Sequence, residues 1–277
     1  MSGAVRRRTL PGFGLTMGLT LTLLSIVVLI PLAGLFVKTT ELSAVQFWSI
    51  ITSARTLHAL KLSFGLAFAA AIVNLIMGMV IVWALVRYRF PGRRIFDAIV
   101  DIPFALPTAV AGVALTALFA EKGWLGAPLA ALGIKVAFTP VGIFVAMIFI
   151  GIPFVVRTVQ PVLQDLDVEI EEAAGSLGAS RWQTIIRVIL PSLAPALLTG
   201  LALAFARAVG EYGSVIFIAG NLPNVSEIAP LLIVIRLSEF RYADATAIAV
   251  VMLVVSFVII FAVNRLQRWA QSRIPAR

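Results

Sequence analysis

Long apolar runs dominate the chain, and six of them recur along its length. They cover residues 13–37, 60–86, 99–120, 140–160, 193–219 and 245–263. A helix that spans a bilayer needs about 20 mainly apolar residues, and each run is long enough. The runs do not alternate with a period of two, which argues against the strands of a β-barrel. Because lipid cannot pair with exposed backbone groups, the pattern predicts an all-α protein with six transmembrane helices.

Prolines interrupt several of these runs. Pro103 and Pro107 lie in the third run, Pro31 in the first and Pro153 in the fourth. Proline removes a backbone hydrogen bond and kinks a helix, so these positions indicate either ordinary bends or the walls of a central cavity. A shorter apolar run at 228–240 contains charged residues, and we expect an interfacial or re-entrant element there.

Composition supports a membrane protein and excludes several chemistries. Of the 277 residues, 61% are apolar, whereas a soluble domain is typically about 45–50% apolar. The chain has no cysteine, so neither a disulfide framework nor a thiolate metal site is possible. No linker, repeat or low-complexity tract divides the sequence, and we expect one membrane domain over residues 1–277.

The net charge of +9 marks one side of the membrane rather than a nucleic-acid-binding surface. With six spans both termini share a side, and that side carries most of the arginines, among them Arg6, Arg7, Arg8, Arg87, Arg89, Arg93, Arg94, Arg181 and Arg187. Cytoplasmic loops are enriched in lysine and arginine. We therefore expect both termini and residues 161–192 in the cytoplasm. The first run is too long for the apolar part of a signal peptide, about 7–15 residues, so we expect a retained helix.

The polar segment 161–192 predicts two short helices joined at a glycine. Its first helix, from Glu169 to Leu177, has acidic residues in its first turns, where the helix dipole favours negative charge. Gly178 follows, and glycine readily takes the left-handed conformation that ends a helix. Ser180 and Gln183 have the spacing of a capping box, which begins a second helix before Pro191. Composition alone is also compatible with an ordinary solvated loop.

Two charged residues fall inside the fifth run. Arg207 lies near its middle and Glu211 follows at the i+4 position. A charge at the centre of a bilayer costs at least ~2.5–3.5 kcal/mol. The spacing is compatible with an ion pair that faces the helix bundle. Alternatively, Arg207 lines a pathway for an anion, Glu211 limits the strength of binding, and the nearby glycines Gly210 and Gly213 allow a close approach.

No constellation of an enzyme is present in the sequence. There is no Ser-His-Asp arrangement, no metal-binding cluster and no phosphate-binding loop of the G-x-x-x-x-G-K-[ST] type. The single histidine, His58, lies at the end of the second run, where we expect an interfacial role. We predict no catalytic residue, no metal and no cofactor bound by this chain.

The segment from Glu172 to Pro191 resembles the cytoplasmic coupling loop of bacterial ABC-importer permeases. The resemblance rests on Glu172, Ala173, Ala174, Gly178, Val188, Leu190 and Pro191, with valine at 188 where the family more often has isoleucine. It extends through RYRFPGRR (87–94), DIPFALPTAVAG (101–112) and GEYGSVIFIAGN (210–221) to the sulfate/thiosulfate permease subunits of the T type. Molybdate permease subunits are the nearest relatives of that group.

The resemblance implies a type I ABC-importer permease fold in the cytoplasmic (inner) membrane of a bacterium. Its partners would be a homologous second permease subunit, two ATPase subunits that use ATP and Mg, and a periplasmic sulfate-binding protein. Sulfate or thiosulfate would then cross by alternating access, driven through the coupling loop. A molybdate or tungstate permease is the alternative, and an ATPase-independent anion transporter is a more distant one.

Overall fold

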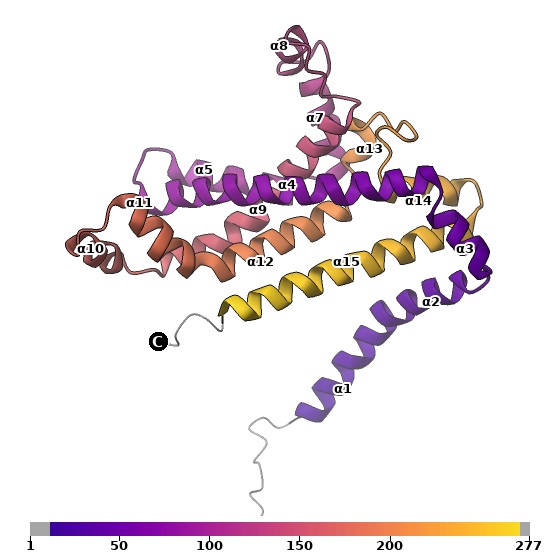
Figure 1. Cartoon of the computed structure of the whole chain (residues 1–277), viewed down its shortest axis with the longest axis horizontal. Helices are drawn as coiled ribbons and strands as arrows, with labels where there is room; N and C mark the ends of the chain where they lie inside the picture. Colours follow the sequence, from indigo (N-terminus) through magenta and orange to yellow (C-terminus); the bar gives the residue numbers. More distant parts are fainter. Residues whose placement is uncertain (1–11, 272–277) are drawn as a thin grey trace, which may run out of the picture.

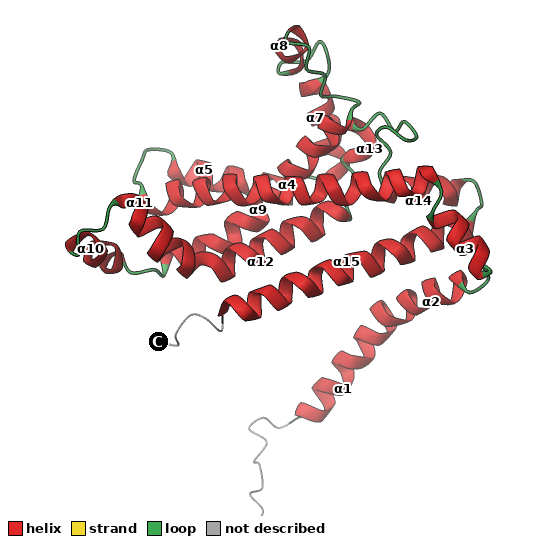
Figure 2. Cartoon of the chain, in the orientation of Figure 1, coloured by secondary structure: helices red, strands yellow, loops and turns green. Residues whose placement is uncertain are grey.

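The computed structural model of the chain describes residues 12–271, and within them no strand is present (Figure 2). In chain order the helices are α1 (Phe13–Leu24), α2 (Ile30–Thr39), α3 (Ala44–Ile51), α4 (Ala54–Arg87), α5 (Arg93–Val100), α6 (Ile102–Ala105), α7 (Thr108–Phe119), α8 (Gly126–Ala131), α9 (Pro140–Gln164), α10 (Val168–Ser176), α11 (Arg181–Thr184), α12 (Leu190–Val209), α13 (Val215–Ile218), α14 (Ala229–Ser238) and α15 (Tyr242–Gln271). The π-helical turns η1 (Ser25–Leu29) and η2 (Ile185–Ile189) join α1 to α2 and α11 to α12. The N-terminal arginines Arg6, Arg7 and Arg8 lie outside the described residues.

Helices α4, α9 and α12 pack closely and form the centre of the protein (Figure 1). Val155 of α9 lies between two glycines, Gly78 of α4 and Gly200 of α12. A methyl group added at Gly78 would lie 2.7 Å from the Val155 side chain, and one at Gly200 would lie 3.1 Å from its Cα. Association of helices in lipid depends on such close contacts, because the surrounding medium is as apolar as the side chains.

Five helical segments of the described chain are long and apolar enough to cross a membrane: 13–39, 54–87, 140–164, 181–209 and 242–266. These segments contain the first, second, fourth and sixth predicted runs. The third predicted run, 99–120, is not one helix. It divides among the end of α5, the short α6 and the 12-residue α7, because Leu106 is extended before Pro107. The residue before a proline is disfavoured in a helix.

The fifth predicted span, 193–219, does not coincide with one helix. The helix begins at Arg181, on the polar segment, and ends at Val209, ten residues before the predicted end. The chain then turns through Gly210 to Ser214 and resumes as the short α13. Arg207 therefore lies in the last turn of α12 and not in the middle of a span.

Both π-helical turns precede a proline. Pro31 follows η1, and Pro191 follows η2. A proline ring clashes with the carbonyl of the residue four positions earlier and supplies no N–H for it. A wider turn relieves that clash, and each helix continues past its proline. The second short helix predicted between Ser180 and Pro191 is therefore the base of the long helical segment 181–209.

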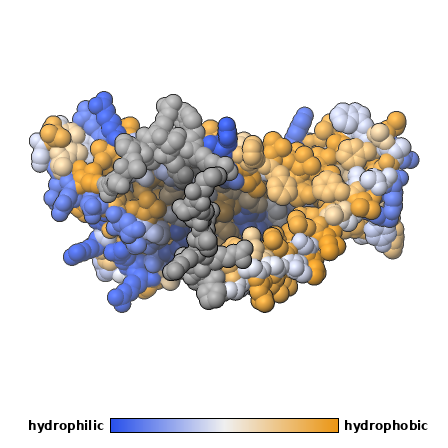
Figure 3. Space-filling model, turned by 90° about the horizontal axis from the view of Figure 1, so that it is seen from below, coloured by the Kyte–Doolittle hydropathy of each residue, from blue (hydrophilic) through white to orange (hydrophobic). Residues whose placement is uncertain are grey.

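The two ends of the molecule differ in character. Helices α10 and α11 project at one end, here called the loop end, and α3 and α14 lie at the other, the opposite end (Figure 1). Hydrophilic residues gather at the loop end, whereas a hydrophobic surface covers much of the remaining face (Figure 3). Exposed apolar side chains occur on α1, η1 and α15, such as Leu15, Val27 and Phe261. The short α14 includes most of the residues of the apolar segment 228–240. It packs against α15 and α4.

Candidate functional site

The turn between α10 and α11 has the geometry that the sequence predicted. Gly178 has φ = +83°, the left-handed conformation that glycine adopts without strain. The backbone N–H of Ser180 donates to Gln183 Oε1 at 2.8 Å, and the backbone N–H of Gln183 donates to Ser180 Oγ at 3.3 Å. These reciprocal bonds confirm the capping box and set the direction in which α11 leaves the turn.

The seven residues of the coupling-loop pattern divide between two elements. Glu172, Ala173 and Ala174 lie on α10, and Gly178 lies in the turn. The other three, Val188, Leu190 and Pro191, lie beyond the turn, in η2 and at the start of α12. The residues of the pattern therefore lie partly on the projecting tip and partly at the base of the long helix α12.

Two large apolar side chains at the tip are almost fully exposed, and the sequence pattern did not single them out. Leu177 is 89% exposed and Trp182 is 73% exposed, on either side of the Gly178 turn. Beside them Glu172 and Ala173 are exposed, whereas Ile170 and Ala174 are partly covered by the rest of the molecule. Exposed apolar side chains grouped with a carboxylate on a polar projection are typical of a protein contact surface.

An ion pair fastens the projection to the centre of the bundle. Arg87, the last residue of α4, places Nη2 at 2.7 Å from Glu171 Oε1 in the first turn of α10. The same nitrogen donates to the backbone carbonyl of Leu166 at 3.2 Å. Both side chains are mostly covered. The ion pair therefore links the first turn of α10 to the end of α4.

A second arginine connects the loop-end part of α9 to α5. Arg157 donates to both carboxylate oxygens of Asp101 and to Oδ1 of Asp97, each at 2.7 Å. It also donates to Gln160 Oε1 at 2.7 Å. A guanidinium matches this set because its five N–H donors lie in one plane. No sequence pattern signalled this network, in which Arg157 lies 60 and 56 positions from Asp97 and Asp101.

The charged pair of the fifth run is an ion pair within the turn that ends α12. Arg207 Nη1 donates to Oε2 of Glu211. The other carboxylate oxygen, Oε1, accepts from both the backbone N–H and the hydroxyl of Ser214 at 2.8 Å. Glu211 is buried, and these bonds satisfy its charge. Arg207 remains about one-third exposed and makes no other side-chain hydrogen bond within the described residues.

The exposed side of Arg207 lies on an uncovered face of α12. Leu203, Ala206 and Gly210 share that face at helical spacing and are exposed. Gly213 behaves differently, because a methyl group there would lie 2.1 Å from the Thr108 hydroxyl at the start of α7. The predicted close approach is therefore confirmed at Gly213, where a second segment touches the turn, whereas Gly210 has open space.

A buried ion pair at the opposite end was not predicted. Arg55, in the first turn of α4, donates to both oxygens of Glu227, from Nε at 2.7 Å and from Nη2 at 2.6 Å. The Glu227 side chain is fully buried, and it precedes α14 in the sequence. The pair fixes the start of α4 to the segment that leads into α14, across 172 positions of sequence.

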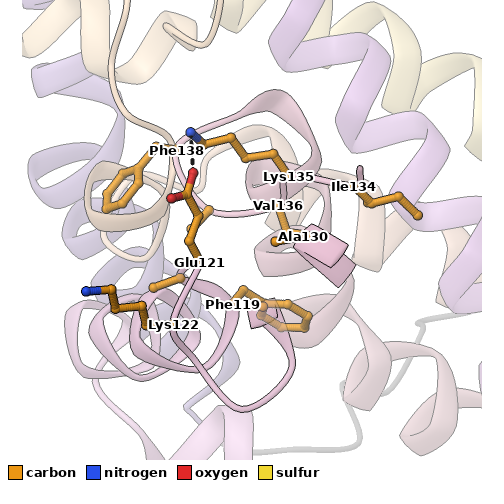
Figure 4. Close-up of a pocket in the computed structure, with 11 residues that line it drawn as sticks. Phe119, Glu121, Lys122, Ala130, Ile134, Lys135, Val136 and Phe138 are labelled. Atoms are coloured by element: carbon orange, nitrogen blue, oxygen red, sulfur yellow. Dashed lines mark ion pairs between the residues drawn. The ribbon is translucent and has the colours of Figure 1, made fainter. Parts of the chain in front are cut away.

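A cavity of about 420 Å³ lies between α7, α8 and residues 134–138, away from the two charged pairs just described (Figure 4). Lys135 and Glu121 form an ion pair at 2.7 Å beside it. This contact holds the pKa of Glu121 below its usual value, so any stability that the pair adds is lost only as the pH falls below about 4. The lining is otherwise mainly apolar, with Phe119, Ile134 and Phe138.

Metal-ion chemistry has no support in the described residues, where no group of three or more His, Asp and Glu side chains is placed to hold an ion. His58 is partly buried on α4 near the opposite end, and its Nδ1 has no hydrogen-bond partner in this part of the chain.

Comparison with known proteins shows the family of the chain. Residues 75–275 match the family described as binding-protein-dependent transport system inner membrane component. The chain is 50% identical over 261 residues to the sulfate transport system permease protein CysT of Escherichia coli strain K12, with 94% of each chain covered. A bacterial ABC transporter involved in the import of the acidic polysaccharide alginate has a similar fold, with a TM-score of 0.76, 18% identity, and 93% of this chain and 96% of that one covered.

A second solved structure, the alginate transporter in complex with a periplasmic protein bound to an alginate pentasaccharide, is similar with a TM-score of 0.75. Its sequence is 20% identical, and the match covers 91% of this chain and 92% of that one. At this identity the two structures support the fold alone. Together with the helices of the described chain, they confirm the predicted all-α membrane fold of an ABC-importer permease.

Proposed function

Because this chain belongs to the family of binding-protein-dependent transport system inner membrane components, we propose that it is the membrane-spanning permease subunit of an ATP-driven sulfate importer. The assignment of sulfate as the substrate rests on the 50% identity to a sulfate permease over 94% of both chains. The absence of a phosphate-binding loop from the sequence means that ATP is hydrolysed by another subunit. ATP and Mg therefore belong to that partner, and the permease contributes the pathway and the coupling.

The projecting α10–α11 tip is the proposed contact with the ATPase subunit. Its exposed Leu177 and Trp182 supply apolar anchors, and Glu172 supplies a charge. From the tip, motion reaches the bundle by two routes, through Arg87 to α4 and through η2 to α12. When ATP binding closes the ATPase dimer, both long helices are displaced together, so the bundle rocks and opens outward. Hydrolysis then resets it inward.

A homologous second permease subunit is the proposed partner for the uncovered face of the bundle. Phe68 and Ile72 of α4 and Leu203 of α12 are exposed, and the ring of Phe68 packs against that of Phe205, two residues before Arg207. A pathway between two subunits would place Arg207 beside the passing anion, because the guanidinium retains N–H donors that Glu211 does not occupy. Glu211 offsets part of the positive potential, which limits the affinity and permits release.

The arginine-rich loop end is the proposed cytoplasmic side, with both termini, and the opposite end with α3 and α14 is the proposed periplasmic side. A periplasmic sulfate-binding protein would dock there and deliver sulfate or thiosulfate. The membrane is then the inner membrane of a bacterium. The molybdate and tungstate alternative is not favoured, since the relatives of high identity are sulfate permeases.

Uptake of radiolabelled sulfate tests the proposal. A strain that lacks this subunit but retains the other subunits is complemented with the chain, and sulfate uptake is measured with thiosulfate or trace molybdate as competitor. We expect uptake to be restored, and to be inhibited by thiosulfate but not by trace molybdate. If a low concentration of molybdate displaced sulfate, molybdate would be assigned as the substrate instead. Uptake that persists when the ATPase subunit is deleted would refute the ATP-driven mechanism.

A further inference from the structure

A cavity of about 800 Å³ lies at the loop end, enclosed by the C-terminal end of α4, the segment that follows it, α10 and the α11–η2 base. It is separate from Arg207 and from the exposed tip residues Leu177 and Trp182, none of which lines it. The ion pair between Arg87 and Glu171 forms part of its wall. The cavity therefore lies beside the coupling loop and borders α4 and the α11–η2 base, the two elements through which the loop is proposed to move the bundle.

The lining of this cavity is strongly basic. Four arginines, Arg87, Arg89, Arg93 and Arg181, contribute to it, with Glu171 as the single carboxylate. Of the four, only Arg87 has an ion-pair partner within the described residues. An excess of positive charge in a concave site raises the local concentration of anions.

Arg87 supplies a second observation that points to a ligand. Its Nε atom is buried and has no hydrogen-bond acceptor in the described chain, and Oε1 of its ion-pair partner Glu171 is likewise buried without a hydrogen-bond donor. A buried donor of a charged group that lacks an acceptor costs free energy, about 1–3 kcal/mol or more. An anion that enters the cavity would accept this hydrogen bond together with those of the neighbouring guanidinium groups. Guanidinium donors match the oxygens of tetrahedral oxyanions in bidentate geometry.

We propose that this cavity, here called the loop-end cavity, binds a tetrahedral oxyanion that restrains the coupling loop. Two sources share this chemistry: free sulfate on the cytoplasmic side, which is the product of transport, and the phosphate headgroup of an anionic lipid. In either case the anion bridges Arg87 on α4 to Arg181 on α11, so it opposes their relative displacement and lowers the rate of transport. The inference rests on the proposed function only for the identity of the free anion and for the effect on transport.

Direct binding tests the cavity without any transport measurement. The full assembly is purified, reconstituted in nanodiscs of phosphatidylcholine alone, and titrated with radiolabelled sulfate and, separately, with inorganic phosphate. The test variant is Arg89→Gln with Arg93→Gln. The matched control is Arg94→Gln, an exposed arginine of the same segment that does not line the cavity. The paired substitution Arg207→Gln with Glu211→Gln, here called the pathway variant, removes both charges together and distinguishes this site from the proposed pathway.

For free anion as the source, we expect sulfate binding to weaken at least tenfold in the double variant. Arg94→Gln and the pathway variant should retain binding at the loop-end cavity. For lipid as the source, sulfate binds weakly, and phosphatidylglycerol co-purifies with the wild type and with Arg94→Gln but is depleted from the double variant. Either result supports the oxyanion site.

The proposal is overturned if neither sulfate, phosphate nor anionic lipid binding differs between the double variant and Arg94→Gln. Equal loss in the pathway variant and in the Arg89→Gln, Arg93→Gln double variant would also overturn it, because the bound anion would then report on the pathway. Failure of sulfate uptake in the complementation experiment would refute the proposed function but would leave these binding results unchanged.

Discussion

The guanidinium of Arg87 and the carboxylate of Glu171 lie 2.7 Å apart and join the last residue of α4 to the first turn of α10. Without this contact α10 would be attached to the bundle mainly through its connecting chain. The pair is mostly covered, so removal of one partner would leave the other charge buried without compensation. The pair therefore connects the projecting loop to α4, the longest helix among the described residues.

Glu171→Gln should therefore uncouple the loop from α4. We expect sulfate uptake to fall by about 5- to 70-fold, since a charge-assisted contact is worth about 1–2.5 kcal/mol. Subunit abundance in the membrane should be unchanged. Glu169→Gln is the control, because Glu169 is exposed in the same helical turn and has no ion-pair partner in the described residues. Equal uptake in the two variants, measured at equal abundance, would show that the pair does not carry the coupling.

Substitution of Gly178 should reduce the coupling without unfolding the bundle. An L-residue at φ = +83° costs roughly 1–2 kcal/mol, so Gly178→Ala distorts the turn and Gly178→Asp adds a charge to it. Gly175→Ala is the control, because Gly175 is helical and a methyl group there meets nothing within 4 Å. We expect ATP-driven sulfate uptake to decrease in Gly178→Ala, to be lost in Gly178→Asp and to persist in Gly175→Ala. Normal uptake in Gly178→Asp would contradict the coupling role of this turn.

Replacement of both Arg207 and Glu211 by neutral residues distinguishes a role of Arg207 in the anion pathway from a role only as the ion-pair partner of Glu211. Arg207→Ala alone leaves Glu211 buried with only the Ser214 bonds, and an uncompensated buried charge costs about 3–5 kcal/mol. The double variant Arg207→Gln with Glu211→Gln removes both charges together. We expect it to assemble at wild-type abundance and to lose most of its sulfate uptake. Retained uptake in the double variant would mean that the residues serve only to pair with each other.

Close packing at the centre predicts an overpacking defect at Gly151. A methyl group there would lie 2.0 Å from Nδ2 of Asn74, a fully buried residue of α4. Gly151→Ala should destabilise the protein by about 1–3 kcal/mol. Gly65→Ala on α4, where nothing lies within 4 Å, should leave the thermal unfolding of the detergent-solubilised protein unchanged. Adding Asn74→Ala should restore much of the stability of Gly151→Ala, and failure to do so would place the defect elsewhere.

The tight turn at Gly178 and the capping box of Ser180 with Gln183 were predictable, because both depend on contacts within a few residues. The apolar runs likewise identified the long helices, since a bilayer imposes a minimum length on each. Where local sequence was ambiguous the predictions failed. Residues 99–120 are apolar throughout, yet the backbone breaks at Leu106, and apolar content alone does not reveal where a helix ends.

The sequence by itself determined the membrane class, the polar loop and the family resemblance, because lipid solvation and local hydrogen bonding act along the chain. Only the tertiary structure decided which charges meet. The partners Arg55 and Glu227 are separated by 172 positions, and Arg87 and Glu171 belong to different helices. Such pairs depend on how the helices cross, which is set by close contacts such as Val155 between Gly78 and Gly200. Packing at that precision is a property of the whole bundle, and no local pattern encodes it.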